Sequence, residues 1–347
     1  MWRFSRWFSR GLGLLCLSLT LNAADQATTP PAKEAFPELP AWFHESFLHL
    51  PDEVAEAKAS GRRLMLYFHQ DGCPYCARLL RENFGDPAIA ARTQELYRVI
   101  ALNLWGDREL TDLAGKTTTE KQFAESLKVM YTPSLLLLKE SGEIALRING
   151  YYPKERFALA LEYGSGQAEA GESFRDFVAR RQTSPAPAGT LRSEPFFLPP
   201  PHDLKQLLAG NHKHLLVIYE QGHCPACDEM HDKALRIEAN RRLLERLDVI
   251  QLDTRGQMPL VTPDGERLTA AAWADRLGIK YTPSLVFFDD QGQEVFRVEA
   301  FLWSFHFQSA LEYVATLAYR EQPNFQRFLQ ARRERLREQG KEVKLQD

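Results

Sequence analysis

The chain has 347 residues, of which 44% are hydrophobic and 26% are charged. This length suffices for about two domains, and the composition is that of a globular protein able to bury a core. The formal net charge of −3 argues against a nucleic-acid-binding protein, whose surface is usually basic.

Residues 1–23 have the layout of a secretory signal peptide. Three arginines come first, the apolar run GLGLLCLSLTL follows, and NAAD supplies small residues for cleavage. The apolar run is short for a membrane span, which needs about 20 residues, although an uncleaved anchor is the alternative. We therefore expect an exported, periplasmic or extracellular protein without stable membrane insertion after cleavage. Removing three arginines and no acid would also make the net charge more negative.

The cysteines fall into an informative pattern. Cys16 lies in the apolar run, and the remaining four form two C-P-x-C pairs, Cys73 with Cys76 and Cys224 with Cys227. An exported protein that used disulfides for stability would link distant segments with them. No cysteine remains for that purpose, so a purely structural role is the weaker interpretation.

The two cysteine pairs lie in two copies of one sequence unit. RRLMLYFHQDGCPYC aligns with HKHLLVIYEQGHCPAC, and LKVMYTPSLLLLKESGEIALRINGYY aligns with LGIKYTPSLVFFDDQGQEVFRVEAFL. The repeat extends over about 150 residues, whereas solenoid repeats have about 20–50, so it indicates two whole domains.

Both copies predict the same order of elements. Each begins with a helix, at 51–61 in the first copy and 202–211 in the second, and a strand follows at 64–68 and 215–219. The cysteine pair then opens a second helix. A strand at 97–104 and 247–253 and an amphipathic helix at 119–129 and 269–279 come next. After the shared YTPS come two strands joined by a glycine turn, and then a closing helix. This order predicts an α/β fold, with a central mixed sheet flanked by helices in each copy.

We place the first domain at residues 40–180 and the second at 202–322. Residues 181–201 are rich in proline, serine and alanine, which is typical of a partly extended linker. Residues 323–347 form a charged C-terminal tail, which we expect to be a solvated or frayed helix.

The C-P-x-C spacing suits thiol chemistry. A thiol reacts as its thiolate, which a helix N-terminus stabilises through unpaired N–H groups and the positive end of the helix dipole. Proline fits the first helical position because it has no N–H to leave unpaired. The second cysteine then lies about one turn further on, close enough for a disulfide. We therefore predict Cys73 and Cys224 as the attacking residues, with Cys76 and Cys227 resolving the mixed disulfide.

Two other uses of paired cysteines fit less well. Zinc sites commonly combine two such pairs about 15–20 residues apart, whereas here the pairs lie in separate repeats; a zinc-linked dimer or clasp stays as an alternative. Covalent haem attachment needs a histidine after the second cysteine, but Ala77 and Asp228 stand there.

A strand, a C-x-x-C pair at a helix start and a later Thr-Pro before a hairpin resemble the thioredoxin family, and the resemblance covers about residues 45–320 in two copies. It is strongest to exported members, such as SoxW-type thioredoxins and the catalytic domains of disulfide-bond (Dsb) proteins. The resemblance implies cis peptide bonds before Pro133 and Pro283, with Thr132 and Thr282 offering backbone groups to a substrate strand. It implies no metal and no organic cofactor.

The chain departs from ordinary thioredoxins around the cysteines. Gly72 and His223 replace the tryptophan before the first cysteine, and proline takes the second position of the motif. Tyr67 and Ile218 stand where thioredoxins carry a buried acid, and Glu220 is near that position in the second copy only. These departures count against fast thioredoxin-like reduction, more so for the first domain.

Other side chains near the motifs have candidate roles. A protonated His223 beside Cys224 could lower the pKa of the thiol, and His69 is a second candidate, with an ordinary surface histidine as the alternative. Tyr75 is expected to pack or to contact substrate. Core or interface positions are expected for Trp105, Trp273 and Trp303.

The leading hypothesis is an exported thiol–disulfide oxidoreductase acting on protein cysteines, with a redox partner that recycles it. The resemblance favours reduction of substrates, whereas the C-P-Y-C dipeptide and the doubled domain suit an oxidase or isomerase. A thioredoxin-fold chaperone or assembly scaffold is the alternative of a different class.

Overall fold

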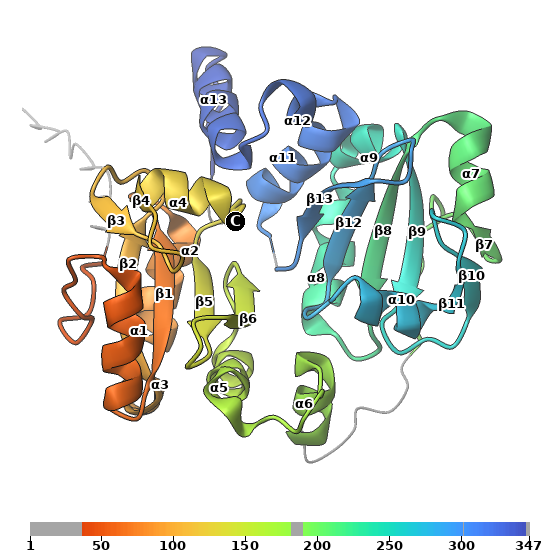
Figure 1. Cartoon of the computed structure of the whole chain (residues 1–347). Helices are drawn as coiled ribbons and strands as arrows, with labels where there is room; N and C mark the ends of the chain where they lie inside the picture. Colours follow the sequence, from red (N-terminus) through yellow and green to blue (C-terminus); the bar gives the residue numbers. More distant parts are fainter. Residues whose placement is uncertain (1–36, 182–189, 301, 345–347) are drawn as a thin grey trace, which may run out of the picture. The chain divides into compact units, whose positions relative to one another are not determined.

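The computed structural model describes residues 37–181, 190–300 and 302–344 (Figure 1). The predicted signal peptide, residues 1–23, lies outside the described residues. By their contacts, Phe36–Asp347 form one unit, to which both sequence repeats belong.

The first repeat folds around a four-stranded mixed sheet of order β2-β1-β5-β6. Its strands are β1 (Arg63–His69), β2 (Tyr97–Asn103), β5 (Ser134–Leu138) and β6 (Ile144–Asn149). β1 pairs in parallel with β2 and antiparallel with β5, which pairs antiparallel with β6. Successive side chains of β1 alternate between two apolar clusters, since Met65 belongs to one and Leu66 to the other. Both faces of the sheet are therefore buried.

The second repeat has the same arrangement, with the order β13-β12-β8-β9. Its strands are β8 (His214–Glu220), β9 (Leu247–Asp253), β12 (Ser284–Phe288) and β13 (Glu294–Val298). Leu216 and Val217 again point into separate apolar clusters on the two faces. The prediction of two α/β units, each with a mixed sheet between helices, is confirmed (Figure 1).

The helices follow the predicted order with additions. In the first repeat they are α1 (Leu50–Ala59), α2 (Pro74–Arg78), η1 (Leu79–Asn83), α3 (Pro87–Leu96), α4 (Glu120–Ser126), α5 (Lys154–Glu162), η2 (Tyr163–Gln167) and α6 (Phe174–Arg181). In the second they are α7 (Leu204–Asn211), α8 (Pro225–Asp232), η3 (Ala234–Arg236), α9 (Glu238–Leu244), α10 (Ala270–Arg276), α11 (Ser304–Ala315), α12 (Ala318–Glu321) and α13 (Phe325–Glu338).

A small hairpin that the sequence analysis did not predict precedes the amphipathic helix in each repeat. In the first repeat it is formed by β3 (Glu109–Thr111) and β4 (Thr117–Thr119), and in the second by β10 (Pro259–Val261) and β11 (Arg267–Thr269). β7 (His202–Asp203) pairs in parallel with β10. Strands this short carry too few residues for a period-two pattern to stand out.

The described part of the predicted linker packs on the second repeat. Residues 182–189 lie outside the described residues, but Phe197 is buried in an apolar cluster of the second repeat. The N–H of Leu198 donates to the carbonyl of Val249 at 2.8 Å. Phe197 and Leu198 are therefore packed on the second repeat, although they lie within the predicted linker.

The C-terminal tail also differs from expectation. Within it, α13 buries Phe325, Phe328 and Leu329, and Arg332 forms an ion pair with Glu312 at 2.7 Å. The apolar side chains recur at positions i, i+3 and i+4, so they share one face of the helix despite the many charges around them. The expectation of a solvated or frayed helix is wrong for α13, one face of which is buried.

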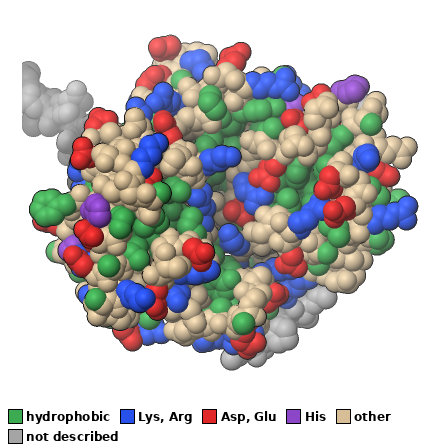
Figure 2. Space-filling view, in the orientation of Figure 1, with side chains coloured by type: hydrophobic (Ala, Val, Ile, Leu, Met, Phe, Trp, Pro, Cys, Tyr) green, Lys and Arg blue, Asp and Glu red, His purple; other side chains and the backbone are tan. Residues whose placement is uncertain are grey.

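The surface carries no dominant charge on the face drawn in Figure 2, where acidic and basic side chains are interspersed. None of the helices in the described part of the chain combines the length and the apolarity that a membrane crossing requires.

Replacement of Trp273 by alanine is expected to lower the free energy of unfolding of the second repeat by about 4 kcal/mol. The indole is 1% exposed and packs against Tyr219 and Phe288, so its removal leaves a large cavity. Urea unfolding of the oxidised protein measures the loss. Leu113→Ala, at a 40% exposed position, is the control that should leave stability nearly unchanged.

Candidate active sites

The first cysteine pair lies where β1 leads into α2. Cys73 is the residue before the helix, Pro74 takes its first turn, and the N–H of Cys76 donates to Cys73 Sγ at 3.0 Å. The two cysteines form a disulfide with a Cα–Cα distance of 5.2 Å. The predicted placement at a helix N-terminus is confirmed, and the N–H of Cys76, which can stabilise a thiolate, points at Cys73 Sγ.

The Thr-Pro loop lies against this disulfide. Cys73 Sγ is 3.3 Å from both the carbonyl oxygen and the hydroxyl oxygen of Thr132. The Thr132–Pro133 peptide bond is cis, as predicted. The binding of a substrate strand by Thr132 stays a prediction.

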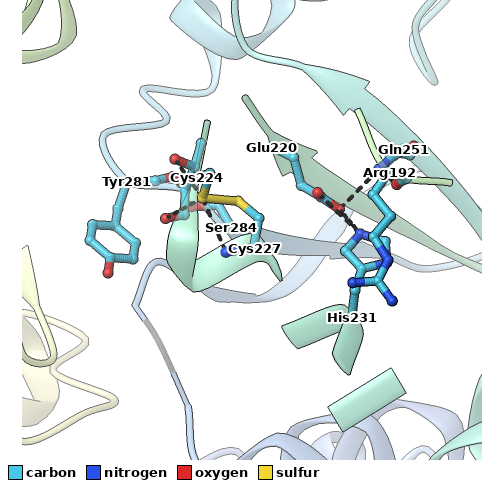
Figure 3. The surroundings of a disulfide bond; sticks show 9 residues. Arg192, Glu220, Cys224, Cys227, His231, Gln251, Tyr281 and Ser284 are labelled. Carbon is cyan, nitrogen blue, oxygen red and sulfur yellow. Dashed lines mark hydrogen bonds and ion pairs between the residues drawn. A yellow bond between two sulfur atoms is a disulfide. The ribbon is translucent and has the colours of Figure 1, made fainter. Parts of the chain in front are cut away.

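The second cysteine pair repeats this geometry (Figure 3). Cys224 precedes α8, and the N–H of Cys227 donates to Cys224 Sγ at 3.1 Å. The disulfide has a Cα–Cα distance of 5.1 Å, and Cys224 Sγ lies 3.6 Å from the carbonyl oxygen of Thr282. The Thr282–Pro283 bond is also cis. Each pair therefore closes on itself rather than on the other.

Exposure distinguishes the two cysteines of each pair. Cys73 is 4% exposed and Cys76 is completely buried, while Cys224 is 6% and Cys227 is 3% exposed. The first cysteine is the more accessible in both pairs, which suits an attacking thiol followed by a resolving one. These roles stay predictions.

The position before the first cysteine has a left-handed backbone in both repeats. Gly72 has φ +68° and His223 has φ +55°. Glycine adopts this conformation freely, whereas a side chain is strained there. The exposed His223 makes no hydrogen bond to Cys224 within the described residues, and its proposed effect on the thiol stays a prediction.

His69 and Glu220 occupy equivalent positions at the ends of β1 and β8. The Nδ1 atom of His69 is buried without a hydrogen-bond partner among the described residues, and the ring stacks on Tyr67. Burial lowers the pKa of His69, while the charges of Asp71 and Glu120 act in the opposite direction. A mostly neutral His69 would contribute little positive charge toward Cys73, so its role as a tuning residue remains a prediction.

The second repeat holds a buried chain of titratable groups behind its disulfide (Figure 3). His231 is completely buried, its Nε2 lies 3.1 Å from Glu220 Oε1, and its Nδ1 lies 2.8 Å from Glu194 Oε1. The amide of Gln251 also donates to Glu220 at 3.1 Å. Burial alone lowers the pKa of His231, but the hydrogen bonds and charges of the two carboxylates outweigh it, and the pKa is raised.

Sequence reasoning identified Glu220 but missed His231 and Glu194. A signal for His231 existed, because it lies four residues after Cys227 on α8 and therefore on the same face of the helix. Glu194 lies in the predicted linker and gave no such signal. The first repeat has Leu80 at the position equivalent to His231, so the chain of groups is confined to the second repeat.

Tyr75, between the first pair of cysteines, packs against the second repeat. Its hydroxyl accepts a hydrogen bond from the N–H of Trp303 at 2.7 Å, and the two rings stack with centroids 4.3 Å apart. The expectation that Tyr75 packs, and that Trp303 is an interface residue, is met. Trp105 lies against the core of the first repeat and donates to Gln70 at 2.7 Å.

The tyrosine before each Thr-Pro also crosses to the other repeat. Tyr131 packs against Phe296 and Phe325, with ring centroids 5.7 and 5.6 Å away. Tyr281 stacks on Tyr152 at 5.1 Å. The two Thr-Pro loops therefore each have a neighbour supplied by the same chain.

The family described as thioredoxin-like domain matches residues 50–165 and again residues 200–315. Among curated proteins, none matches the chain.

Several solved structures are similar to parts of the chain. A thioredoxin-fold protein from Helicobacter pylori is 16% identical, with 35% of this chain and 82% of that chain covered and a TM-score of 0.32. A thioredoxin from Thermus thermophilus is 26% identical, covering 39% and 94% with a TM-score of 0.28. The C-terminal domain of DsbD from Neisseria meningitidis, in its oxidised form, is 11% identical, covering 33% and 90% with a TM-score of 0.25.

Proposed function

Because the chain belongs to the thioredoxin-like domain family and contains that domain twice, we propose that it is an exported thiol–disulfide oxidoreductase acting on the cysteines of other proteins. The observation that carries the proposal is the geometry of both centres. Each disulfide lies at a helix N-terminus, with its more exposed cysteine beside a Thr-Pro loop. A thiol placed in this way is both activated and accessible to one partner strand.

Exchange proceeds in two balanced steps. In the reduced centre, the thiolate of Cys73 attacks one sulfur of a substrate disulfide, forms a mixed disulfide and expels the other substrate sulfur as a thiolate. Cys76 then attacks Cys73 Sγ and releases the second substrate thiolate, which leaves the Cys73–Cys76 disulfide of the structure. Cys224 and Cys227 act in the same way in the second centre.

The direction we propose is reduction of substrate disulfides, supported by the resemblance to exported SoxW-type thioredoxins. A reduced redox partner then recycles each centre. The export of the protein rests on the signal-like layout of residues 1–23. The domain limits of the proposal are 40–180 and 202–322, with residues 190–201 and α13 packed on the second domain.

The reduction potential of each centre tests both the activity and its direction. Thiol tagging and mass spectrometry across dithiol buffers would be read for each pair, in variants that lack the other pair. We expect potentials near about −270 mV, as in a reducing thioredoxin, whereas values near about −120 mV would reverse the direction to oxidation. If neither pair opens and closes at any potential, the oxidoreductase proposal fails.

A further inference from the structure

A pocket of about 320 Å³ opens beside the first disulfide. Its lining includes Cys73 and Tyr75 from the first repeat, Phe305 and His306 from α11, and Phe325 and Arg333 from α13. Pockets of about 300–1,000 Å³ are the usual size for small-molecule ligands. A pocket beside Thr282, lined by residues of both repeats, has only about 20 Å³, which is room for about one water.

The second repeat covers one side of this pocket through specific contacts. Trp303 stacks on Tyr75. The side-chain amide of Gln326 on α13 donates to the carbonyl of Met130 at 3.1 Å and accepts from Gln70 at 2.8 Å. α13 is therefore hydrogen-bonded to both sides of the first active site. A ligand that enters the pocket meets aromatic rings, polar side chains and Cys73 Sγ, and the contacts between the two repeats limit its size.

Unpaired polar nitrogens concentrate at the helical side of the pocket. Arg333 and His306 line the pocket. Arg333 Nε and His306 Nδ1 are buried and have no hydrogen-bond partner within the described residues, and the same is true of Nη1 of the adjacent Arg332. Leaving such groups buried and unpaired is costly, so a ligand that pairs with them gains affinity. Burial, and then the charges of Arg332 and Arg333, lower the pKa of His306 to about 4, so the ring is neutral near pH 7.

The carboxylates on the pocket lining do not compete for these nitrogens. Glu299 is engaged by Asn149 at 3.4 Å and by Arg297 at 3.5 Å, and Asp71 is exposed. The Arg333 guanidinium, whose Nε is unpaired within the described residues, favours a carboxylate, because charge-assisted hydrogen bonds are roughly twice as strong as neutral ones.

We infer that this pocket binds a small disulfide that carries a carboxylate, and that it presents one sulfur of that disulfide to Cys73. The inference rests on the proposed function and names an additional substrate class for the first centre. The Cys73 thiolate forms a mixed disulfide with one half of the ligand and expels the other half as a thiolate. Cys76 then releases the second half, so the ligand gains two electrons and the centre becomes a disulfide.

Two matched probes test the inference in a single turnover. The full chain carrying Cys224→Ser and Cys227→Ser would be reduced, freed of reductant, and mixed with dithiodipropionate or with its uncharged diamide. Acid trapping and mass spectrometry follow oxidation of the Cys73–Cys76 pair. Each rate is divided by the rate of the same probe with free dithiothreitol, which removes the intrinsic reactivity of the probe. We expect the dianion to react about tenfold faster than the diamide on this scale.

Arg333→Gln should abolish the preference for the dianion, so that the corrected rates of the two probes become equal, and continued reaction with a peptide disulfide shows that the site remains folded. Arg337→Gln, at an exposed position of the same helix, is the control that should keep the preference. Equal corrected rates for the two probes with Arg333 in place, or a preference that survives Arg333→Gln, would overturn the inference. Reaction with a peptide disulfide but with neither probe overturns it too and leaves the proposed function standing. A reduced centre that reacts with no disulfide defeats both.

Discussion

Serine at both Cys73 and Cys224 should lower thiol–disulfide exchange to the uncatalysed rate, a loss of about three orders of magnitude or more. These two sulfurs accept hydrogen bonds from the N–H groups of Cys76 and Cys227, and the hydroxyl that replaces each of them is a far weaker nucleophile. The rate is measured as the increase in fluorescence when reduction of a peptide disulfide releases its fluorescent half. Either single variant should keep the activity of the remaining centre.

The buried cysteines provide the matched control for that experiment. Cys76→Ser and Cys227→Ser retain the attacking thiol but remove the resolving one, so each centre should stop at a mixed disulfide that mass spectrometry can detect. Full exchange by the variant without Cys73 and Cys224 would reject the oxidoreductase proposal. Chaperone activity in a cysteine-free variant would then support the scaffold hypothesis.

His231→Leu is expected to destabilise the second domain by about 3–5 kcal/mol near pH 6, because removing one partner of a buried ion pair leaves charge uncompensated. The substitution would leave the carboxylates of Glu220 and Glu194, which are 2% and 12% exposed, without the imidazole between them. Urea unfolding of the oxidised protein measures the difference. The first domain, with Leu80 at the equivalent position, serves as the internal control.

The pH dependence of this stability has a definite sign. The pKa of His231 is raised in the folded protein, so protonation favours folding. The contribution of His231 is fully present below its unfolded pKa of about 6.5 and is lost as the pH rises through the folded value. The wild type should therefore lose a component of stability above about pH 6.5 that is absent from His231→Leu. The same slope in both proteins would contradict the raised pKa.

Much of the fold could be predicted because the repeat allowed each pattern to be seen twice. The central strands are short apolar runs that align in both copies, as do the Thr-Pro loops, and the C-P-x-C pairs define where the helices begin. Local sequence rules are sufficient at these places, since a short apolar run and a proline each act within a few residues.

The parts that escaped prediction depend on contacts between distant segments. Glu194 gains its role only when the linker packs beside His231. The buried face of α13 was hidden by a high density of charge, and Arg333 reaches the first active site from the far end of the sequence. The contacts of Glu194 and Arg333 have no local sequence signature, because side chains far apart in sequence meet only after the chain has folded.

The packing of Tyr131 and Tyr281 across the two repeats bears on how strongly another protein would have to bind at the Thr-Pro loops. A neighbour tethered in the same chain acts at an effective concentration of about millimolar, even though no second molecule is present. A protein that docks at either Thr-Pro loop by displacing these aromatic contacts must outcompete that internal neighbour. If substrates dock there, duplication of the domain therefore selects for partners that bind the loop more strongly than the neighbouring repeat does.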